Sequence, residues 1–216
     1  MILSKPLEDD AQQVLTRWYV SRETRDRLVA YADLTRQWQK SMNLVAPSTL
    51  PTLWTRHIED GLWLHSIGKN RRAWVDLGSG GGFPGLVVAC CLADDEGRSM
   101  ALVEANGKKC AFLRHVVREL ALPATVHHTR IEQASAVIAG ADAVSARALA
   151  SLDALCGYVA PALLADGHCY FLKGRTHPVE IEDATAHWRF DMVKHTSRTD
   201  AESVILELSN IAAQAA

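Results

Sequence analysis

The sequence has no apolar run long enough to cross a membrane, and its opening residues, Met-Ile-Leu-Ser-Lys-Pro-Leu-Glu-Asp-Asp, carry no secretion signal. We therefore expect no membrane contact and a cytoplasmic location. Only five of the 216 residues are cysteines, and no two have Cys-x-x-Cys spacing. This odd number indicates neither a disulfide framework nor a zinc site. We predict that the cysteines belong to the core and that the chain holds no metal.

A strong excess of charge of either sign is also missing. The net charge is −2, which does not by itself indicate a nucleic-acid-binding protein. The two parts of the chain differ, however: residues 1–72 have 11 basic and 8 acidic side chains, a net charge of +3, whereas residues 73–216 have 12 and 17, a net charge of −5. With 48% hydrophobic and 22% charged residues, the chain has the composition of a globular protein, with length enough for one α/β domain and an extension.

The most distinctive stretch contains four glycines in five residues, Gly78 and Gly80 to Gly82, directly after the apolar run that begins at Trp74. The pattern predicts a strand, a tight loop and a helix that begins near Pro84. Glycine is needed where the backbone has a positive φ or must approach a ligand closely. The loop therefore predicts a binding site for a small molecule.

The neighbours of the loop narrow the choice of ligand. Residues 80–85 satisfy Gly-x-Gly-x-x-Gly, and Glu104 lies where a ribose-binding acid belongs, so an NAD-linked oxidoreductase stays open. No Gly-Lys-Ser/Thr follows, which excludes a P-loop. Asp76, at the strand's end directly before the glycines, suits a ligand with a cationic amino-acid end rather than a pyrophosphate. S-adenosylmethionine has such an end, and we favour it.

Alternating strands and helices are predicted from the apolar periodicity of the remaining chain. They indicate an α/β protein with the Rossmann-like fold of class I S-adenosylmethionine-dependent methyltransferases, in which a seven-stranded, mostly parallel sheet ends in an antiparallel strand. We assign residues 1–70 to an N-terminal helical extension and residues 71–216 to the methyltransferase domain. The predicted strands cover residues 73–77, 99–104, 125–129, 141–146, 168–172, 190–195 and 203–208.

Polar side chains follow the predicted strands at their carboxyl ends, where open α/β sheets bind ligands. Glu104 suits the ribose hydroxyls, Glu132 and the backbone of Ile131 suit the adenine edge, and Phe83 suits the adenine face. Arg147 and Lys173 stand where a substrate should meet the methyl group. A strand-end acid can instead cap a helix or be solvated, and those readings stay open for Glu104 and Glu132.

Six segments of the chain carry distinctive motifs: Trp38–Leu44, Arg56–Asp60, Asp76–Gly85, Lys108–Leu113, Ser145–Ala148 and Leu172–Gly174. Together they resemble the motifs of a known family, the bacterial small-subunit ribosomal RNA guanine-N7 methyltransferases, also called the glucose-inhibited division protein B family. The resemblance covers nearly the whole chain. The sequence departs from the family pattern in two places, because the family often has Asp where Glu104 stands and Asn where Gln39 stands.

The resemblance implies that S-adenosylmethionine is the cofactor and that the acceptor is N7 of guanine 527 in the decoding region of 16S rRNA, alone or in the small ribosomal subunit. Guanine N7 has a lone pair and no proton to lose, so no general base is required. We predict that the chain acts as a monomer, with His57 structural or in contact with RNA. Combined with the loop argument, the expected cofactor contacts are Gly78, Gly80, Phe83, Glu104, Ala105, Asn106, Ile131, Glu132 and Arg147.

Three alternatives remain at this stage. The first is an S-adenosylmethionine-dependent enzyme that methylates a small molecule or a protein, and the second is the NAD-linked oxidoreductase. A binding module without catalytic activity is the third. The basic extension favours RNA as the substrate, and the lack of an obvious hydride-transfer pair disfavours NAD.

Overall fold

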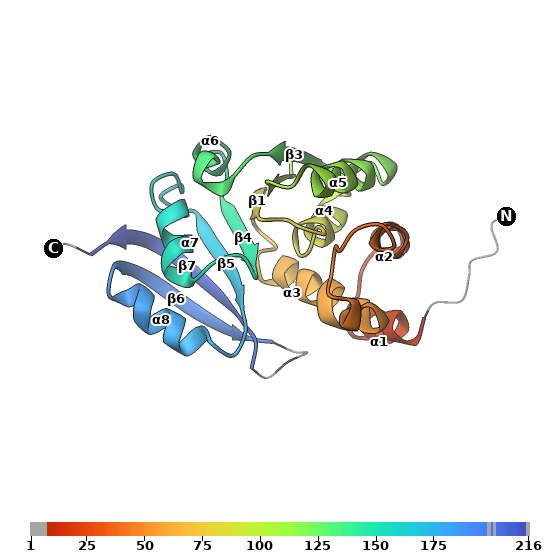
Figure 1. Ribbon diagram of the computed structural model, residues 1–216, viewed down its shortest axis with the longest axis horizontal. Coiled ribbons are helices and arrows are strands. Elements are labelled where there is room, and N and C mark those ends of the chain that lie inside the picture. Colours follow the sequence, from red (N-terminus) through yellow and green to blue (C-terminus); the bar gives the residue numbers. More distant parts are fainter. Residues whose placement is uncertain (1–7, 198–199, 201, 215–216) are drawn as a thin grey trace.

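A seven-stranded sheet forms the centre of the computed structural model, which describes residues 8–197, 200 and 202–214 (Figure 1). The strand order is β3-β2-β1-β4-β5-β7-β6, and β7 pairs antiparallel to both of its neighbours. This is the predicted sheet, with its last strand antiparallel. The strands are β1 (Ala73–Leu77), β2 (Ser99–Glu104), β3 (Ala124–His128), β4 (Ala143–Arg147), β5 (His168–Lys173), β6 (Trp188–Thr196) and β7 (Val204–Ala213).

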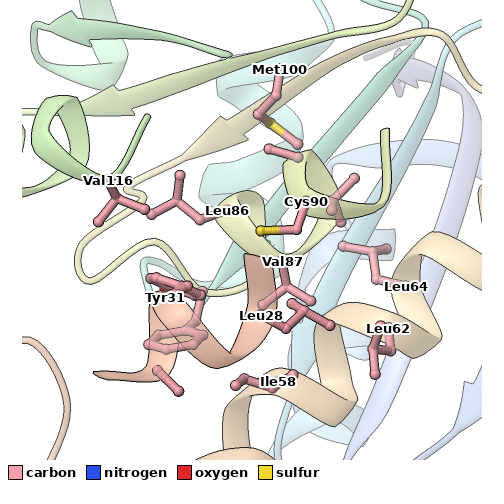
Figure 2. Close-up of a cluster of buried hydrophobic side chains, with 14 of the residues drawn as sticks. Leu28, Tyr31, Ile58, Leu62, Leu64, Leu86, Val87, Cys90, Met100 and Val116 are labelled. Carbon is pink, nitrogen blue, oxygen red and sulfur yellow. The ribbon is translucent and has the colours of Figure 1, made fainter. Parts of the chain in front are cut away.

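Each face of the sheet is covered by its own hydrophobic cluster. On β1, Trp74 faces one cluster, while Val75 and Leu77 face the other, as the alternation of a strand requires. The first cluster lies beneath α4 (Gly85–Leu92) and α5 (Gly107–Glu119), and Figure 2 shows part of it. The second lies beneath α6 (Ser135–Ile138), α7 (Leu152–Val159) and α8 (His177–Thr185).

The N-terminal helices pack on the face covered by α4 (Figure 1). They are α1 (Asp9–Arg17), α2 (Arg22–Gln39) and α3 (Glu59–Ile67). Ser21 caps α2, because its hydroxyl accepts a hydrogen bond from the N–H of Thr24. Side chains from these helices share one cluster with the sheet, as Figure 2 shows for Leu28 of α2 and Met100 of β2. The division of the chain at residue 70 stays a prediction.

Two stretches before α3 are helical but not α-helical. Residues Pro47–Thr52 form a 3-10 helix. Trp54–Ile58 form a π-helix that runs directly into α3. Such wide turns occur often at functional sites. This one carries Arg56 and His57.

The cysteine prediction is confirmed for four of the five residues. Cys90, Cys110, Cys156 and Cys169 are buried and Cys91 is half-buried, and all five are free thiols. None of the helices in the described part of the chain is both long enough and apolar enough to span a bilayer.

Candidate active site

The loop after β1 has the backbone that its glycines suggested. Gly78 and Gly80 have φ angles of +65° and +55°, in the left-handed region that side chains with a Cβ rarely adopt. The Gly80 N–H donates a 2.8 Å hydrogen bond to Oε2 of Glu104, and the Ser79 N–H donates to the carbonyl of Val103. The loop is therefore tied to the end of β2 at two points.

A cavity of about 400 Å³ opens beside this loop, within the size range of small-molecule sites. A Cβ at Gly80, which lines the cavity, would meet nothing closer than 3.7 Å, so it would fit at ordinary van der Waals distance from the protein. Lys109 and Tyr158 also line the wall, and the sequence analysis singled out neither for the cofactor. The predicted cofactor residues among the lining residues are Gly78, Gly80, Glu104, Ala105, Ile131 and Glu132.

Glu104 is fixed before any ligand arrives. Its Oε1 accepts a 2.7 Å hydrogen bond from the Asn106 N–H, and its Oε2 accepts the bond from Gly80. Each carboxylate oxygen can accept a further hydrogen bond, so the group still has capacity for hydroxyl donors. Its alternative role as a helix cap belongs to Asn106, whose Oδ1 accepts from the N–H groups of Lys108 and Lys109.

Three predicted cofactor residues do not line the smaller cavity: Asn106, Phe83 and Arg147. Asn106 is used as the cap of α5. Phe83 was expected to pack on an adenine face, but it is buried against the rings of Tyr31 and His57, with centroid distances of 4.9 Å and 5.1 Å. The Phe83 ring therefore lies in the protein interior and does not line the cavity.

Asp76 also differs from its expected role, because it lines neither this cavity nor the larger one described below. The carboxyl group is buried, and its Oδ1 accepts a 2.7 Å hydrogen bond from the Ser145 hydroxyl. Burial raises its pKa to about 6, and the hydrogen bond from Ser145 limits the rise. This position does not support direct contact with a cationic ligand, because the carboxyl group instead binds Ser145 on the neighbouring strand β4.

A second, larger cavity of about 600 Å³ lies next to the first. Arg147 at the end of β4 and Lys173 at the end of β5 both line it, as does Asp60 from α3. Residues 148–150 line both cavities and form their common wall. The two residues predicted to position a substrate are thus brought together, on the opposite side of this wall from the predicted cofactor residues.

Arg147 is held by the wide turn before α3. Its Nη2 donates a 2.6 Å hydrogen bond to Nδ1 of His57, and its Nη1 lies 3.6 Å from Oδ2 of Asp60. The guanidinium carbon stands 5.8 Å above the Phe83 ring centroid, within range for a cation–π interaction. Burial lowers the pKa of Arg147, while the negative charge of Asp60 opposes that change.

The hydrogen bonds around His57 show which of its two ring nitrogens carries the proton. Arg147 can only donate, so Nδ1 accepts, and the ring proton is on Nε2, which lies 2.8 Å from the Thr49 hydroxyl. That hydroxyl donates in turn to the carbonyl of Ala46. Burial, with the charges of Arg147 and Arg56, lowers the pKa of His57 to about 3. The imidazole is therefore neutral, and the lone pair on Nδ1 already accepts a hydrogen bond from Arg147.

We expect this neutral histidine to make the protein less stable in acid. The unfolded chain binds a proton near pH 6.5 but the folded His57 only near pH 3, so stability is lost as pH falls below 6.5. Between pH 7 and pH 5 the loss from this group is about 2 kcal/mol. Urea unfolding of the wild type and His57→Asn at both pH values measures it. An equal pH dependence in the two proteins contradicts the assignment.

Lys173 is fixed as firmly as Arg147. The side chain was expected to face substrate or solvent, but it is buried, and Nζ donates to Oε2 of Glu180 at 2.7 Å and to the Ala150 carbonyl at 2.6 Å. Burial acts to raise the pKa of Glu180, but hydrogen bonds from Lys173 and Thr176 outweigh it and hold that pKa below its usual value. The pair anchors the wall between the cavities to α8.

The N-terminal helices contact the glycine loop directly. The Tyr31 hydroxyl on α2 donates a 2.6 Å hydrogen bond to the carbonyl of Gly81. A Cβ at Gly81 would lie 2.8 Å from the carbonyl oxygen of Leu44, so the two backbones are in close contact there. Gln39 holds that neighbouring segment, accepting from the N–H groups of Leu44 and Val45. The N-terminal helices and the segment after α2 therefore pack against the glycine loop, whose Gly78 and Gly80 line the smaller cavity.

Comparison with known proteins decides the family. The model of the family described as rRNA small subunit methyltransferase G, or GidB, matches residues 24–208. The chain belongs to this family. The ribosomal RNA small subunit methyltransferase G of Rhizobium meliloti is 48% identical over 202 residues, covering 92% of this chain and 95% of the relative. That of Rhizobium etli is 51% identical over 194 residues, covering 89% and 95%.

Solved structures confirm the fold of this methyltransferase. The cofactor-bound Rv0187 from MTB has a TM-score of 0.63 at 12% identity, covering 95% of this chain and 98% of the other. The SAH-bound Podospora anserina methyltransferase PaMTH1 has a TM-score of 0.59 at 11% identity, covering 97% and 99%. The fold is the predicted class I methyltransferase fold. As a member of the methyltransferase G family, the protein is an enzyme that methylates ribosomal RNA, which sets aside the small-molecule, protein and NAD-linked alternatives.

Two groups of this methyltransferase site were not predicted from the sequence. Glu180, 7 residues after Lys173, binds the lysine and caps the start of α7 by accepting from the Leu152 N–H. Thr49 holds His57 through its hydroxyl. No pattern marks either residue, because both act through contacts between elements far apart in the sequence.

Proposed function

We propose that the protein transfers a methyl group from S-adenosylmethionine, bound in the smaller cavity, to N7 of guanine 527 of 16S rRNA, bound in the larger one. The observation that carries this proposal is the pair of cavities with one common wall, residues 148–150, at the carboxyl ends of β1, β2 and β4. Open α/β sheets bind ligands at this edge. Two adjoining cavities fit a reaction between a cofactor and a second substrate.

The residues of the smaller cavity fit the proposed cofactor. Gly80 leaves space that a side chain would fill, and Glu104 presents a fixed carboxylate with capacity for the ribose hydroxyls. Ile131 and Glu132 also line this cavity, and we assign them to the adenine edge of the cofactor. When bound, S-adenosylmethionine supplies a sulfonium methyl group: the N7 lone pair forms the new bond to carbon, the electron pair of the broken S–C bond returns to sulfur, and no proton leaves N7.

The task of the protein residues is then to hold the guanine with N7 in line with the methyl group. Arg147 is assigned to the O6 edge of the base, where its N–H groups can donate to the O6 acceptor and leave N7 free to react. Its fixed hydrogen bond to His57 orients the guanidinium group before the base arrives. Lys173, held by Glu180 and the Ala150 carbonyl, positions the wall. His57 is neutral and accepts from Arg147, so it is not a general base.

The reaction is tested with methyl-labelled cofactor and small ribosomal subunits that lack the modification, followed by nucleoside identification. We expect label in 7-methylguanosine. Label in another nucleoside contradicts the assigned acceptor atom, and no transfer to the subunit contradicts the proposed substrate. The same assay, run on naked 16S rRNA beside the assembled subunit, decides which of the two is the substrate. The predicted monomer is checked separately by light scattering.

The mechanism predicts a rate that does not depend on a base near neutral pH. His57→Asn and Glu132→Gln are measured in single turnovers, with saturating cofactor, from mildly acidic to mildly basic pH. We expect the pH profiles of both variants to match that of the wild type, because neither side chain removes a proton. A wild-type rate with one ionisation near neutral pH that disappears in either variant means that a base is used and that N7 is not the acceptor.

We further expect binding of the RNA to weaken steeply with salt. Exposed basic side chains that neutralise phosphates release counterions, so log K changes by ~0.7 per contact and log unit of salt for single-stranded targets. Filter binding over a range of potassium concentrations gives the slope, and a flat response contradicts phosphate contacts. The candidates with exposed side chains are Arg22, Arg25, Lys40, Lys108 and Arg175.

A further inference from the structure

The wall between the two cavities contains an apolar side chain that is not buried in the core. Leu149 is 36% exposed, yet it lines both the smaller and the larger cavity. Large apolar side chains with this exposure are few among the described residues, and of those residues only Leu149 lies at the proposed site. Its apolar surface faces the space that two ligands would fill.

The backbone before Leu149 is strained. Ala148 has a φ of +50°, in the left-handed region where a Cβ crowds the following carbonyl. A glycine would adopt this conformation without strain. Strained residues persist where the surrounding structure fixes them, and they gather at functional sites. Here the strained residue directly precedes the side chain that lines both cavities.

The glycine loop is shaped to receive Leu149. A Cβ built on Gly78 would lie 2.6 Å from Cδ1 of Leu149, which is closer than two carbon atoms can pack. The absence of a side chain at Gly78 therefore admits Leu149 against the loop. The position of Leu149 is thus fixed from two sides, by the conformation of Ala148 and by the space at Gly78.

We propose that Leu149 is the partition between cofactor and substrate and that the strained Ala148 sets its position. The inference rests on the proposed function and adds a positioning role that is not implied by the cavities alone. The methyl group crosses from one cavity to the other over this wall. Transfer requires the reacting atoms to be ~3–3.5 Å apart and aligned, so a wall that shifts by 1 Å misplaces them.

The test uses a matched pair of variants. Ala121, at the end of α5, has nearly the same strained backbone, with a φ of +48°, and lines neither cavity. Ala148→Gly and Ala121→Gly should each raise the melting temperature by about 2–4 °C, because both relieve the same strain. Only Ala148→Gly should also slow single-turnover methylation, by roughly tenfold, because the wall is then free to move.

Leu149→Ala completes the series with a measurement that does not depend on turnover. Removing the side chain takes apolar contact from the cofactor cavity, so calorimetry should show S-adenosylhomocysteine bound roughly tenfold more weakly. Methylation at saturating cofactor should still fall by roughly 10- to 100-fold. Leu149→Met, which keeps the volume, should recover most of both properties.

The outcomes separate this inference from the proposed function. If the wild type methylates the small subunit but Ala148→Gly and Leu149→Ala do so at its rate, the partition is wrong. It is also wrong if Ala121→Gly slows methylation as much as Ala148→Gly. If the wild type binds S-adenosylhomocysteine but modifies no guanine, the proposed acceptor fails. The partition is then judged on binding, where unchanged affinity in Leu149→Ala overturns it.

Discussion

Replacing Gly80 with leucine is expected to weaken binding of S-adenosylmethionine by ~100-fold or more, equivalent to about 2.8 kcal/mol. Gly80 lines the smaller cavity, and a Cβ there would meet no protein atom closer than 3.7 Å, so we expect a leucine side chain to extend into the volume proposed for the ligand. The Gly80 N–H also fixes Glu104, and a non-glycine residue at a φ of +55° strains that contact. Calorimetry on the folded variant measures the loss.

A leucine at a second glycine distinguishes the effect of backbone strain from the effect of blocking the cofactor cavity. Gly97 has a φ of +74° in an exposed turn and lines neither cavity, and a Cβ there would meet only the end of the Arg72 side chain at 3.4 Å. Gly97→Leu carries similar strain and should bind the cofactor as the wild type does. If Gly80→Leu is folded and binds with unchanged affinity, the smaller cavity is not the cofactor site.

Replacing Arg147 is expected to reduce methyl transfer by ~10²-fold, the cost of misplacing a reacting group by about 1 Å, because the guanine is then no longer held in line with the methyl group. Arg147→Lys keeps the positive charge but cannot donate to His57 and stand near Asp60 through a planar fork. The side chain is only 21% exposed, so the variant leaves buried partners unsatisfied. Single-turnover rates at saturating cofactor measure the effect.

The same variant decides between two roles for Arg147. The sequence analysis listed it both as a cofactor contact and as a substrate-positioning residue, but it lines only the larger cavity. We therefore expect the affinity of Arg147→Lys for S-adenosylhomocysteine to change less than ~3-fold, within 0.7 kcal/mol. A large loss of cofactor affinity, with a normal rate once cofactor is saturating, contradicts the substrate-side role. Circular dichroism confirms that the variant is folded.

The sequence predicted those parts of the site that depend on local pattern. Glycines after an apolar strand specify a loop, and residues directly after later strands fall at the same edge of a parallel sheet, so the sequence could place Glu104, Ile131 and Glu132 near the loop, and all three line the smaller cavity. Phe83 shows the limit of that rule. Its place in the glycine loop suggested a contact with the adenine ring of the cofactor. The direction of a side chain in a loop depends, however, on the residues that pack against it, and Phe83 packs against Tyr31.

The contacts that the sequence did not predict join residues far apart in the chain. The π-helical turn at Trp54–Ile58 brings His57 to Arg147, 90 positions away, and no short pattern marks a π-helix. The left-handed backbone at Ala148 is equally hidden, because alanine does not favour it. Such features arise when tertiary packing overrides local preference, and these two lie beside the larger cavity.

The position of β7 has a consequence for synthesis of the chain. β7 lies between β5 and β6 in the sheet, although both of those strands precede it in the sequence. While the chain is being made, at ~5–20 residues per second, β6 has no neighbour to pair with until β7 has been added. During that interval the backbone groups of β5 along one edge stay unpaired, as do those of β6, and the latter strand already carries the apolar Met192 and Val193. Unpaired apolar strands are sites of aggregation, so a nascent chain that pauses before β7 is at its most vulnerable.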